Sequence, residues 1–364
     1  MKNIIFLTYY MGFGGVEKVI STLSNKFSDK GIKCTIITLR NDKCVYTLNS
    51  NIDIIPLYDG EGTPPVKEYG KCFTYLRKLI KDIQPDVIIS MPEEISCKAI
   101  LFLIGLKIPI VVSERNNPWI MPQNKINRLF RRIFYPLVDG IVFQTQEAAE
   151  FFSRNIRNKS TVIPNPLDLS RIPEDWEAPR RKEIVSVGRL ESQKNHSLLI
   201  NAFSEFYKKH NEYHLIIYGK GSEKEALEDL AKNKIPESAY YFAGVTNEVL
   251  KCINGSFMFV LSSDYEGLPN ALIEAMALGL PCISTNCKCG PSSLIENGLN
   301  GLLIPVRNEK AMVQAMCYIA ENEEQALSMG KKAMLIKERL NTDKIVERWK
   351  IYLECIYNKN KIDF

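Results

Sequence analysis

The sequence predicts an α/β protein built from two Rossmann-like domains, each with a parallel sheet. Three observations lead to this fold class: the length of 364 residues, a composition typical of globular proteins, and the alternation of short apolar strands with amphipathic helices. With 45% hydrophobic and 24% charged residues, the chain can bury two cores of ordinary size. A stretch rich in proline and charge interrupts the alternation near residues 164–182. We therefore expect two successive domains.

The first domain is expected to span residues 1–165. Its predicted strands are 3–8, 34–39, 86–90, 108–113, 140–144 and 161–164. Residues 166–182 form the expected interdomain linker, and the second domain spans 183–342. Its predicted strands are 183–188, 214–219, 240–244, 257–262, 281–285 and 301–306. The helical sequence 343–364 is expected to pack back on the first domain.

Charge, cysteine usage and hydropathy bear on where the protein works. Residues 1–165 carry 22 Lys and Arg against 15 Asp and Glu, a net charge of +7, whereas the rest of the chain is at −2. A basic half is typical of a domain that faces phosphates or an anionic membrane surface, although a solvated lysine-rich surface is an alternative. We expect no signal peptide and no membrane-spanning helix. We also expect no zinc site, because the ten cysteines include no CxxC pair.

A glycine-rich turn follows the first predicted strand, at the edge where ligands of parallel sheets bind. Gly12, Gly14 and Gly15 let the backbone approach a ligand, and the helix that begins near Val16 offers an end that favours anions. Glu17 stands where a dinucleotide-binding motif has its third glycine, so NAD binding is weakly supported. A tight strand–helix turn without a ligand is the alternative.

The first strand of the second domain is followed by a turn that carries two cations. Arg189 and Lys194 come after Gly188 within one loop, where fixed cations can clamp a diphosphate. Two solvated surface charges are the alternative interpretation. Gly219 and Gly221 form a further turn after the next strand.

Residues 265–275, YEGLPNALIEA, place two carboxylates around a helix start that has no good cap. Pro269 suits the first helical position, and the helix should run from about 269 to about 278. The expected N-cap, Leu268, has no side-chain acceptor, so the first N–H groups attract an anion. With Glu266 before the helix and Glu274 one turn inside it, the stretch suggests a phosphate that carries hydroxyl groups, such as a nucleotide sugar. A strand–turn–helix with incidental acids is the alternative.

Taken together, these motifs resemble glycosyltransferase family 4, the retaining nucleotide-sugar transferases with the GT-B fold of two Rossmann-like domains. The resemblance covers nearly the whole chain and rests on an ordered set of motifs, of which EGLPNALIEA matches the family's E-x7-E motif. The matching segments are GFGGVEKV, GRLESQKN, YGKGSE, FAGVTNEV, EGLPNALIEA and CGPSSLIENGLNGLLIPV.

The resemblance implies roles for the donor-binding residues. Arg189 and Lys194 resemble the cations that grip the donor diphosphate. Glu266 resembles the glutamate that touches the transferred sugar, and Glu274 resembles the one that accepts hydrogen bonds from the ribose. With Arg189 and Lys194, Glu266 is therefore the expected catalytic set. The resemblance assigns further donor contacts to the backbone turns Gly14, Gly15, Gly188, Gly219, Ala243, Gly244, Val245, Gly267, Leu268, Pro269 and Asn270, of which 243–245 would hold the base, usually uracil.

The acceptor is expected in the first domain. Residues 124–137 form a basic amphipathic helix, in which Lys125, Arg128, Arg131 and Arg132 alternate with apolar residues at helical spacing. In similar enzymes that act on undecaprenyl diphosphate, a basic helix in this region receives the lipid diphosphate; a packed helix with a solvated basic face is the alternative. Arg115 stands where many family members have a histidine, so a histidine base from this domain is excluded. Arg115 and Asn116 are expected acceptor contacts.

The resemblance therefore implies a retaining transferase that moves a hexose or an N-acetylhexosamine from a UDP-sugar to a hydroxyl of an undecaprenyl-diphosphate-linked saccharide in glycan biosynthesis. No D-x-D metal pair appears, so we expect no metal and no cofactor. The expected location is the inner face of the cytoplasmic membrane, with an anionic lipid surface and no nucleic acid as partner. A sugar-nucleotide epimerase of the same fold and an inactive saccharide-binding subunit are the alternatives. The scarcity of histidine disfavours the epimerase, and the intact Arg189, Lys194, Glu266 and Glu274 set disfavours the inactive subunit.

Overall fold

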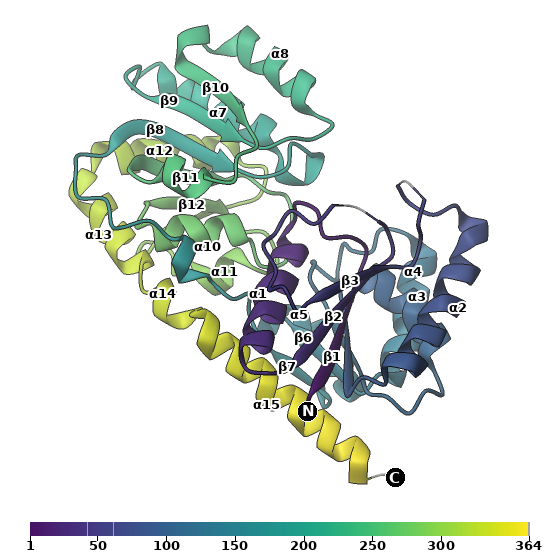
Figure 1. Cartoon of the computed structure of the whole chain (residues 1–364). Coiled ribbons are helices and arrows are strands. Elements are labelled where there is room, and N and C mark those ends of the chain that lie inside the picture. The colour runs from purple at the N-terminus through teal and green to yellow at the C-terminus, as the bar shows by residue number, and fades with distance from the viewer. Residues whose placement is uncertain (42, 61, 363–364) are drawn as a thin grey trace. The chain divides into compact units, whose positions relative to one another are not determined.

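The computed structural model describes residues 1–41, 43–60 and 62–362, and the chain folds into two compact units (Figure 1). The first unit comprises residues 1–166 and the C-terminal helix from Thr342 onward, and the second comprises Leu167–Asn341. All strand pairings described in the two sheets are parallel. The predicted class, an α/β protein with two Rossmann-like parallel sheets, is confirmed.

The first unit has a seven-stranded sheet in the order β3-β2-β1-β4-β5-β6-β7. Its strands are β1 Asn3–Thr8, β2 Lys33–Thr38, β3 Asp53–Pro56, β4 Val87–Ser90, β5 Ile110–Ser113, β6 Gly140–Phe143 and β7 Ser160–Val162. Its helices are α1 Gly15–Asp29, α2 Val66–Ile83, α3 Glu93–Leu103, α4 Lys125–Phe134, the 3₁₀ turn Tyr135–Leu137, α5 Gln146–Glu150, α6 Arg154–Arg157 and α15 Thr342–Ile362. The strands β1, β4, β5 and β6 are buried on both faces, which explains their continuous apolar runs.

Strand β3 was missed by the sequence prediction. It is four residues long, only half buried, and lies at the edge of the sheet, where it pairs with β2 alone. Its last residue is Pro56, which has no N–H to donate and is tolerated in a sheet at such an edge. A short strand of this kind lacks the long apolar run that marks the central strands.

Helix α15 belongs to the first unit. Trp349 is fully buried in the core that β1, β4 and α1 supply, and Arg115 lies over its ring at 5.8 Å. The Tyr352 hydroxyl donates to the carbonyl oxygen of Lys159 at 2.6 Å. Gly140 at the start of β6 makes the approach possible, because a Cβ at that position would collide with Ile356 and Tyr352.

The second unit has a six-stranded sheet in the order β10-β9-β8-β11-β12-β13. Its strands are β8 Arg181–Val187, β9 His214–Tyr218, β10 Tyr240–Gly244, β11 Ser256–Leu261, β12 Cys282–Thr285 and β13 Leu302–Ile304. Its helices are α7 His196–Tyr207, α8 Lys224–Lys234, α9 Val249–Ile253, α10 Asn270–Ala277, α11 Pro291–Leu294, α12 Glu309–Glu321, α13 Glu323–Ala333 and α14 Ile336–Arg339. The 3₁₀ turns are Leu169–Arg171, Ser192–Lys194 and Glu237–Ala239.

Residues 167–180, which the sequence analysis assigned to a linker, pack on the second unit. The N–H of Leu167 donates to the carbonyl oxygen of Leu340 at 2.8 Å. Trp176 covers Gly255, whose φ of +84° and missing Cβ leave room for the indole, and the Arg181 guanidinium lies over the same indole at 5.2 Å. Apart from the 3₁₀ turn at Leu169–Arg171, proline and charge therefore mark a segment without helix or strand here. The chain passes between units at 166–167 and 341–342.

Candidate active site

The candidate site lies at the carboxyl edge of the second sheet. The strand order reverses between β8 and β11, and ligands of open parallel sheets bind at such a switch point. The loop after β8 carries Arg189 and Lys194, and the loop after β11 carries Glu266. Because β8 and β11 are neighbours, the two loops that the sequence motifs singled out lie side by side.

A short ion pair joins these loops. The Nζ atom of Lys194 lies 2.6 Å from Oε1 of Glu266, and both side chains are largely buried, with 14% and 7% of their area exposed. The Ser263 hydroxyl donates to the same oxygen at 2.6 Å. Glu191 is the acidic residue of the loop that carries the two cations, but Lys194 pairs instead with Glu266, 72 residues away. An ammonium group has three donors, so Lys194 can hold Glu266 and an anion together.

Four further hydrogen bonds fasten the two loops together. The Ser262 hydroxyl donates to the carbonyl oxygen of Lys194 at 2.8 Å, and the Asp264 N–H donates to that of Gln193 at 2.9 Å. The Gln193 side chain donates to the carbonyl oxygen of Tyr265, and Asn195 Nδ2 donates to Asp264 Oδ1, both at 2.9 Å. Gln193 and Asn195 lie within the GRLESQKN segment, but no role was predicted for them or for Ser262 and Asp264. No local signal could have paired them, because each bonds to a residue far away in the chain.

Asn195 has a second role in the same loop. Its backbone has φ 46°, a left-handed conformation that asparagine tolerates better than most residues, and it is the N-cap of α7. Its Oδ1 accepts from the N–H of Leu198 at 3.2 Å and from the Ser197 hydroxyl at 2.9 Å. Asn195 therefore fixes the end of the loop that carries Arg189 and Lys194.

Arg189 differs from Lys194 in being exposed. Its guanidinium donates to Gln193 Oε1 at 3.0 Å. Glu191, the acid closest to it in sequence, accepts instead from the N–H and the hydroxyl of Ser222. The guanidinium therefore stays accessible at the mouth of the site, where a planar cation suits a diphosphate.

Helix α10 begins one residue later than predicted. Pro269 is its N-cap, at φ −74°, and its first helical residue is Asn270. No side chain caps this start, as the sequence analysis expected, although it placed the cap at Leu268. Glu274 lies about one turn inside the helix and is half buried. The loop before the helix is held tightly, because a Cβ on Gly290 (φ +99°) would collide with the carbonyl oxygen of Gly267.

The other strand-end turns of the second unit lie along the same edge of the sheet as the loops that carry Lys194 and Glu266. Gly219, at φ +152°, touches the preceding turn so closely that a Cβ would collide with the carbonyl oxygen of Gly188. Its N–H donates to the carbonyl oxygen of Gly244 at 2.7 Å. Ala243 and Gly244 end β10, and Val245, which follows them, is 45% exposed. The donor-binding residues predicted in this unit therefore gather along one edge of its sheet.

His196 is the histidine nearest this edge. It is buried at the start of α7, and burial together with the Lys194 charge lowers its pKa to about 4. It is therefore neutral at physiological pH and is a poor candidate for a general base that must exchange a proton with substrate.

In the first unit, the predicted glycine turn is partly occupied by the protein itself. The Gly14 N–H donates to the Tyr46 hydroxyl at 3.2 Å, and the same hydroxyl donates to the Gly14 carbonyl oxygen at 2.8 Å. Glu17 is buried and its carboxylate fills the space where a Cβ of Gly14 would lie. Gly15 is the first residue of α1. A ligand phosphate at the Gly14 amide would have to displace the bond to Tyr46.

Two predicted acceptor contacts lie at the carboxyl end of β5 and are largely engaged within the unit. Arg115 is 5% exposed and donates from NH1 to Asn165 at 2.8 Å, while its Nε and NH2 atoms have no hydrogen-bond partner among the described residues. Burial lowers the pKa of Arg115 to about 9. Asn116 donates to Oε1 of the buried Glu93 at 2.8 Å.

Helix α4 turns one of its four basic side chains, Arg131, into its own unit. Arg131 is buried and pairs with Glu114 at 3.1 Å, and it also donates to the carbonyl oxygens of Met121 and Pro118. Arg128 donates to the carbonyl oxygens of Pro122 and Ile120, both at 2.7 Å. Lys125, Arg128 and Arg132 are exposed cations of this helix. Arg131, one of the four expected acceptor contacts on α4, is therefore engaged with the buried Glu114 carboxylate.

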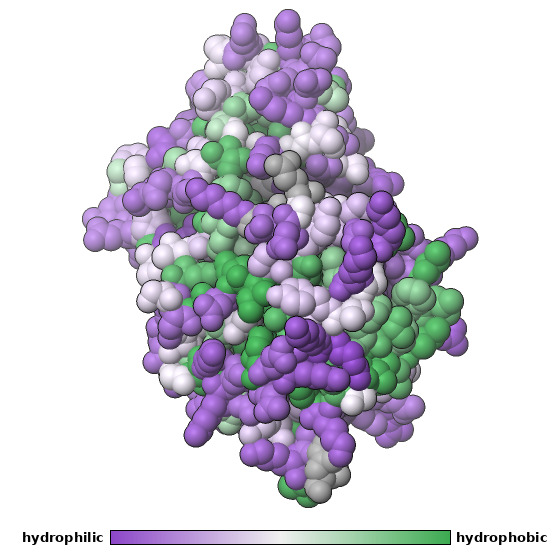
Figure 2. Space-filling model, turned by 45° about the vertical axis from the view of Figure 1, so that its right-hand side comes forward, coloured by the Kyte–Doolittle hydropathy of each residue, from purple (hydrophilic) through white to green (hydrophobic). Residues whose placement is uncertain are grey.

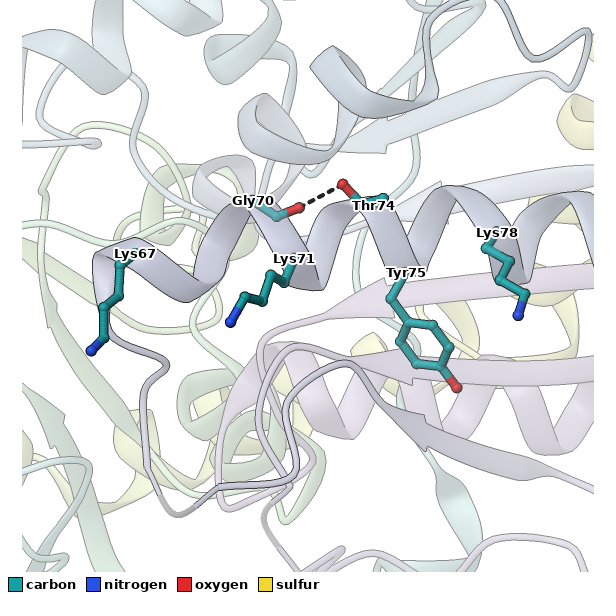
Figure 3. Close-up of a pocket in the computed structure, with 6 residues that line it drawn as sticks. All are labelled: Lys67, Gly70, Lys71, Thr74, Tyr75 and Lys78. Atoms are coloured by element: carbon teal, nitrogen blue, oxygen red, sulfur yellow. Dashed lines mark hydrogen bonds between the residues drawn. The ribbon is translucent and has the colours of Figure 1, made fainter.

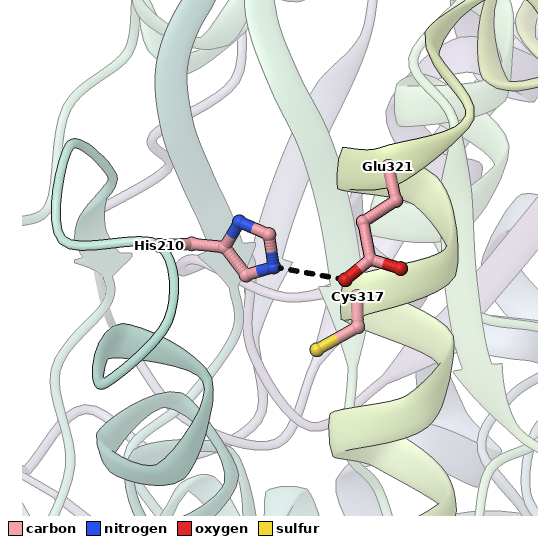
Figure 4. Close-up of side chains that lie close together, drawn as sticks. All are labelled: His210, Cys317 and Glu321. Carbon is pink, nitrogen blue, oxygen red and sulfur yellow. Dashed lines mark ion pairs between the residues drawn. The ribbon is translucent and has the colours of Figure 1, made fainter.

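Two other groups of polar side chains lie outside the candidate site. A shallow hollow on α2 is lined by Lys67, Gly70, Lys71, Thr74, Tyr75 and Lys78 (Figure 3). In the second unit, His210 lies 3.4 Å from Glu321 and close to Cys317 (Figure 4). His210 also stacks on Phe206 at 4.6 Å, so it has a packing role, and the pair belongs to the layer of α7 and α12. Neither group belongs to the candidate site around Lys194 and Glu266.

Known proteins share this organisation. Residues 13–171 match the family described as Glycosyltransferase Family 4, and residues 170–335 match the one described as Glycosyl transferases group 1. A Haemophilus influenzae protein described as an uncharacterized glycosyltransferase is 30% identical over 353 residues, which cover 96% of this chain and 99% of the relative. The fold and these matches define the class: this protein is a glycosyltransferase. It belongs to glycosyltransferase family 4, whose GT-B fold the sequence predicted.

A second relative and a solved structure are more specific about chemistry. A Campylobacter jejuni protein named N-acetylgalactosamine-N,N'-diacetylbacillosaminyl-diphospho-undecaprenol 4-alpha-N-acetylgalactosaminyltransferase is 28% identical over 351 residues, covering 92% of this chain and 94% of that protein. A crystal structure of a variant of S. aureus TarM, in complex with fondaparinux, alpha-GlcNAc-glycerol and UDP, superposes with a TM-score of 0.81 at 17% identity, covering 97% of this chain and 100% of the other. At this identity the superposition shows the fold alone.

Among the described residues, none of the helices combines the length and apolar composition that crossing a membrane requires.

We predict that the Lys194–Glu266 pair is strongly coupled in stability. Lys194→Met should lower the free energy of unfolding by about 3 kcal/mol, because it leaves the Glu266 carboxylate buried without its cation. The double variant Lys194→Met/Glu266→Gln should recover most of that loss, since no charge then remains buried. Urea denaturation of both single variants and the double variant measures the coupling.

The matched control for this cycle is Arg307→Met. Arg307 pairs with Asp264 at 2.6 Å on the same face, but its side chain is 74% exposed, so its loss should cost less than about 1 kcal/mol. Additive effects of the Lys194 and Glu266 substitutions would contradict the coupling.

Glu93 gives a prediction about pH. Burial, with repulsion from Glu114 as the next cause, raises the pKa of Glu93 to about 8. The folded chain then keeps a proton that the unfolded chain releases near pH 4.5, so this residue makes stability fall as pH rises from that value toward 8. Glu93→Gln should therefore raise the melting temperature at pH 8 and change it little at pH 5, as thermal scans at both values can show.

Glu150→Gln is the control for that experiment, because Glu150 is an exposed carboxylate of the same unit. It should leave the melting temperature unchanged at both pH values. A Glu93→Gln variant that gains nothing at pH 8 would show that the carboxyl is ionised without cost in the folded protein.

Proposed function

We propose that this protein is a retaining glycosyltransferase that moves a hexose or an N-acetylhexosamine from a UDP-sugar to a hydroxyl of a polyprenyl-diphosphate-linked saccharide. The observation that carries the proposal is the Lys194–Glu266 pair beside the uncapped start of α10. This arrangement offers fixed positive charge to a diphosphate and a carboxylate to the sugar attached to it. The names of the Campylobacter relative and of the UDP-bound TarM structure support the choice of acceptor and donor class.

The chemistry follows from where charge develops. As the bond from sugar to diphosphate breaks, negative charge grows on the leaving phosphate and positive charge grows on the sugar ring. Arg189, Lys194 and the first N–H groups of α10 meet the phosphate, in a site whose dipoles are already oriented. Glu266, which Lys194 and Ser263 hold in place, would face the positive sugar carbon. Glu274 would accept from the ribose hydroxyls, because a carboxylate suits a pair of donors.

The acceptor proton needs a destination. His196 is buried and neutral, and the first unit has no histidine. We assign proton acceptance to an oxygen of the departing phosphate, on the same face of the sugar as the leaving group, which accounts for retention of configuration. In this proposal cations replace a divalent metal at the diphosphate, and the reaction runs without metal.

The acceptor is assigned to the first unit. Lys125, Arg128 and Arg132 are exposed on α4 and are the cations that we assign to an acceptor phosphate. Arg115 has two donors without partners among the described residues, but both are buried, so a phosphate would reach them only after a local rearrangement. Arg131 is withdrawn from this role, because Glu114 and carbonyl oxygens occupy its donors. We place the protein at the inner face of the cytoplasmic membrane, where undecaprenyl-diphosphate-linked acceptors would be met.

Turnover tests the cation assignment. Arg189→Ala should lower kcat about 10²–10³-fold, as the loss of a preorganised electrostatic contact does. It should change the melting temperature little, because Arg189 is exposed and bonds only to Gln193 in the described contacts. Release of UDP in the presence of a lipid-linked saccharide measures turnover. Lys220→Ala, which removes another cation of a strand-end turn, is the control, and normal turnover of Arg189→Ala would remove the clamp assignment.

Binding of UDP separates the two glutamates. Glu274→Ala should weaken UDP about tenfold, the loss of about 1.4 kcal/mol, because UDP keeps the ribose that this residue is assigned to. Glu266→Gln should change the Kd of UDP by less than about twofold, since UDP lacks the sugar and the amide still fits the space. Calorimetry in EDTA tests both expectations and the metal independence together. Equal losses would reverse the assignment, and binding that appears only with added Mg²⁺ would reject the metal-free site.

A further inference from the structure

An apolar surface lies on α3 and α4 of the first unit. Six aliphatic side chains on it are each between 44% and 60% exposed: Leu101, Ile104, Ile126, Leu129, Ile133 and Leu137. Figure 2 brings forward the side of the molecule that carries α2, α3 and α4 in Figure 1, and hydrophobic side chains gather there. Single exposed aliphatic residues are common, but a contiguous group of this kind marks a surface that something else covers.

The periodicity of α4 shows that this exposure is built into the helix. Ile126, Leu129 and Ile133 follow the spacing of one helical face, and Leu137 continues it in the 3₁₀ turn. On the opposite face, Arg131 is buried and donates to Glu114 and to the carbonyl oxygens of Met121 and Pro118, while the exposed Arg128 donates along the surface to the carbonyl oxygens of Pro122 and Ile120. A helix that only packed on a water-soluble protein would bury its aliphatic face and leave Arg131 in water.

Exposing the aliphatic side chains of α4 to water costs free energy, and an apolar environment around them would remove that cost. Exposed aliphatic area costs roughly 25 cal/mol per Å², and a buried cation needs a partner to offset its desolvation. Glu114, together with the carbonyl oxygens of Met121 and Pro118, satisfies Arg131. Among the described residues of the unit, nothing covers this aliphatic face to the extent that would bury it, since its side chains stay 44–60% exposed.

The charges beside this face indicate what covers it. Lys125 and Arg132 lie on the flank of α4 next to the aliphatic face and are exposed. On α2, Lys67, Lys71 and Lys78 are also exposed, and all residues up to 165 together carry a net charge of +7 (Figure 3). An apolar stripe flanked by cations is complementary to the acyl and headgroup layers of an anionic membrane.

We infer that α4 and the end of α3 form a lipid-docking face: the six aliphatic side chains enter the acyl boundary of an anionic bilayer, while Lys125 and Arg132 contact its headgroups. The inference rests on the proposed function, since a lipid-linked acceptor lies at such a surface, and it names the membrane partner of that function. Apolar insertion holds the protein on the bilayer, and Arg128 and Arg131 anchor the helix to its own unit. Salt should therefore weaken binding only in part.

Vesicle sedimentation tests this face on the whole protein. The probes are vesicles of phosphatidylcholine alone and of equimolar phosphatidylcholine and phosphatidylglycerol. The triple variant Ile126→Ser/Leu129→Ser/Ile133→Ser should bind the anionic vesicles at least tenfold more weakly than the wild type, at low and at high salt. Lys125→Ser/Arg132→Ser should lose binding mainly at low salt. Ile351→Ser is the matched control, because Ile351 is 60% exposed on α15 of the same unit, and it should bind as the wild type does.

Two further measurements keep the outcomes distinct. The pair Leu101→Ser/Ile104→Ser, on another helix of the same face, should also weaken vesicle binding, which guards against misfolding of one variant. Calorimetry with UDP reports on the proposed function separately: a wild type that binds vesicles but not UDP would remove the function and keep the lipid-docking face. Wild-type binding by both aliphatic variants would overturn the inference, and so would a wild-type dimer that the triple variant converts to monomer.

Discussion

The candidate site depends on one short ion pair, Lys194 to Glu266, between loops that follow neighbouring parallel strands. A largely buried pair stabilises a fold only when its remaining hydrogen-bonding groups are satisfied, and Ser263 and the bonds around Asn195 and Asp264 supply that support. Because the pair fixes both loops, it also fixes the position of the uncapped α10 start. Positive charge and oriented N–H groups are thereby held in place before any ligand arrives, which is what electrostatic stabilisation of a leaving diphosphate requires.

In the first unit, a buried ion pair likewise fixes a structural element, helix α4. Glu114 at the end of β5 accepts from Arg131 and from the Tyr135 hydroxyl, so the buried carboxylate holds α4 by its basic side. The aliphatic side of the helix is left outward as a consequence. A surface that would be a liability in water becomes useful where the acceptor is anchored in lipid. The buried Glu114 carboxylate thus holds α4 in the orientation that presents its aliphatic side to the membrane in our proposal.

The central strands and the row of strand-end motifs were predictable, because long apolar runs and glycine turns are local signals. Strand β3 was not, since its four half-buried residues carry no such signal. The partners of Lys194 and Asn195 could not be predicted either, because Glu266 and Asp264 come close to them only through the pairing of β8 with β11. Which side of α4 turns inward could not be predicted for a similar reason: helical periodicity separates two faces, but only Glu114, which is distant in the sequence, pairs with Arg131 and holds that side inward.

The most direct test of the account is the position of UDP in a crystal structure of this protein grown with UDP and without divalent metal. The account predicts that the β-phosphate lies within about 3 Å of both the Arg189 guanidinium and Lys194 Nζ, at hydrogen-bonding distance. It also predicts that Lys194 keeps its bond to Glu266 and that Glu274 contacts the ribose. A phosphate bound away from the α10 start, or a Lys194 that leaves Glu266 to reach it, would contradict the central claim.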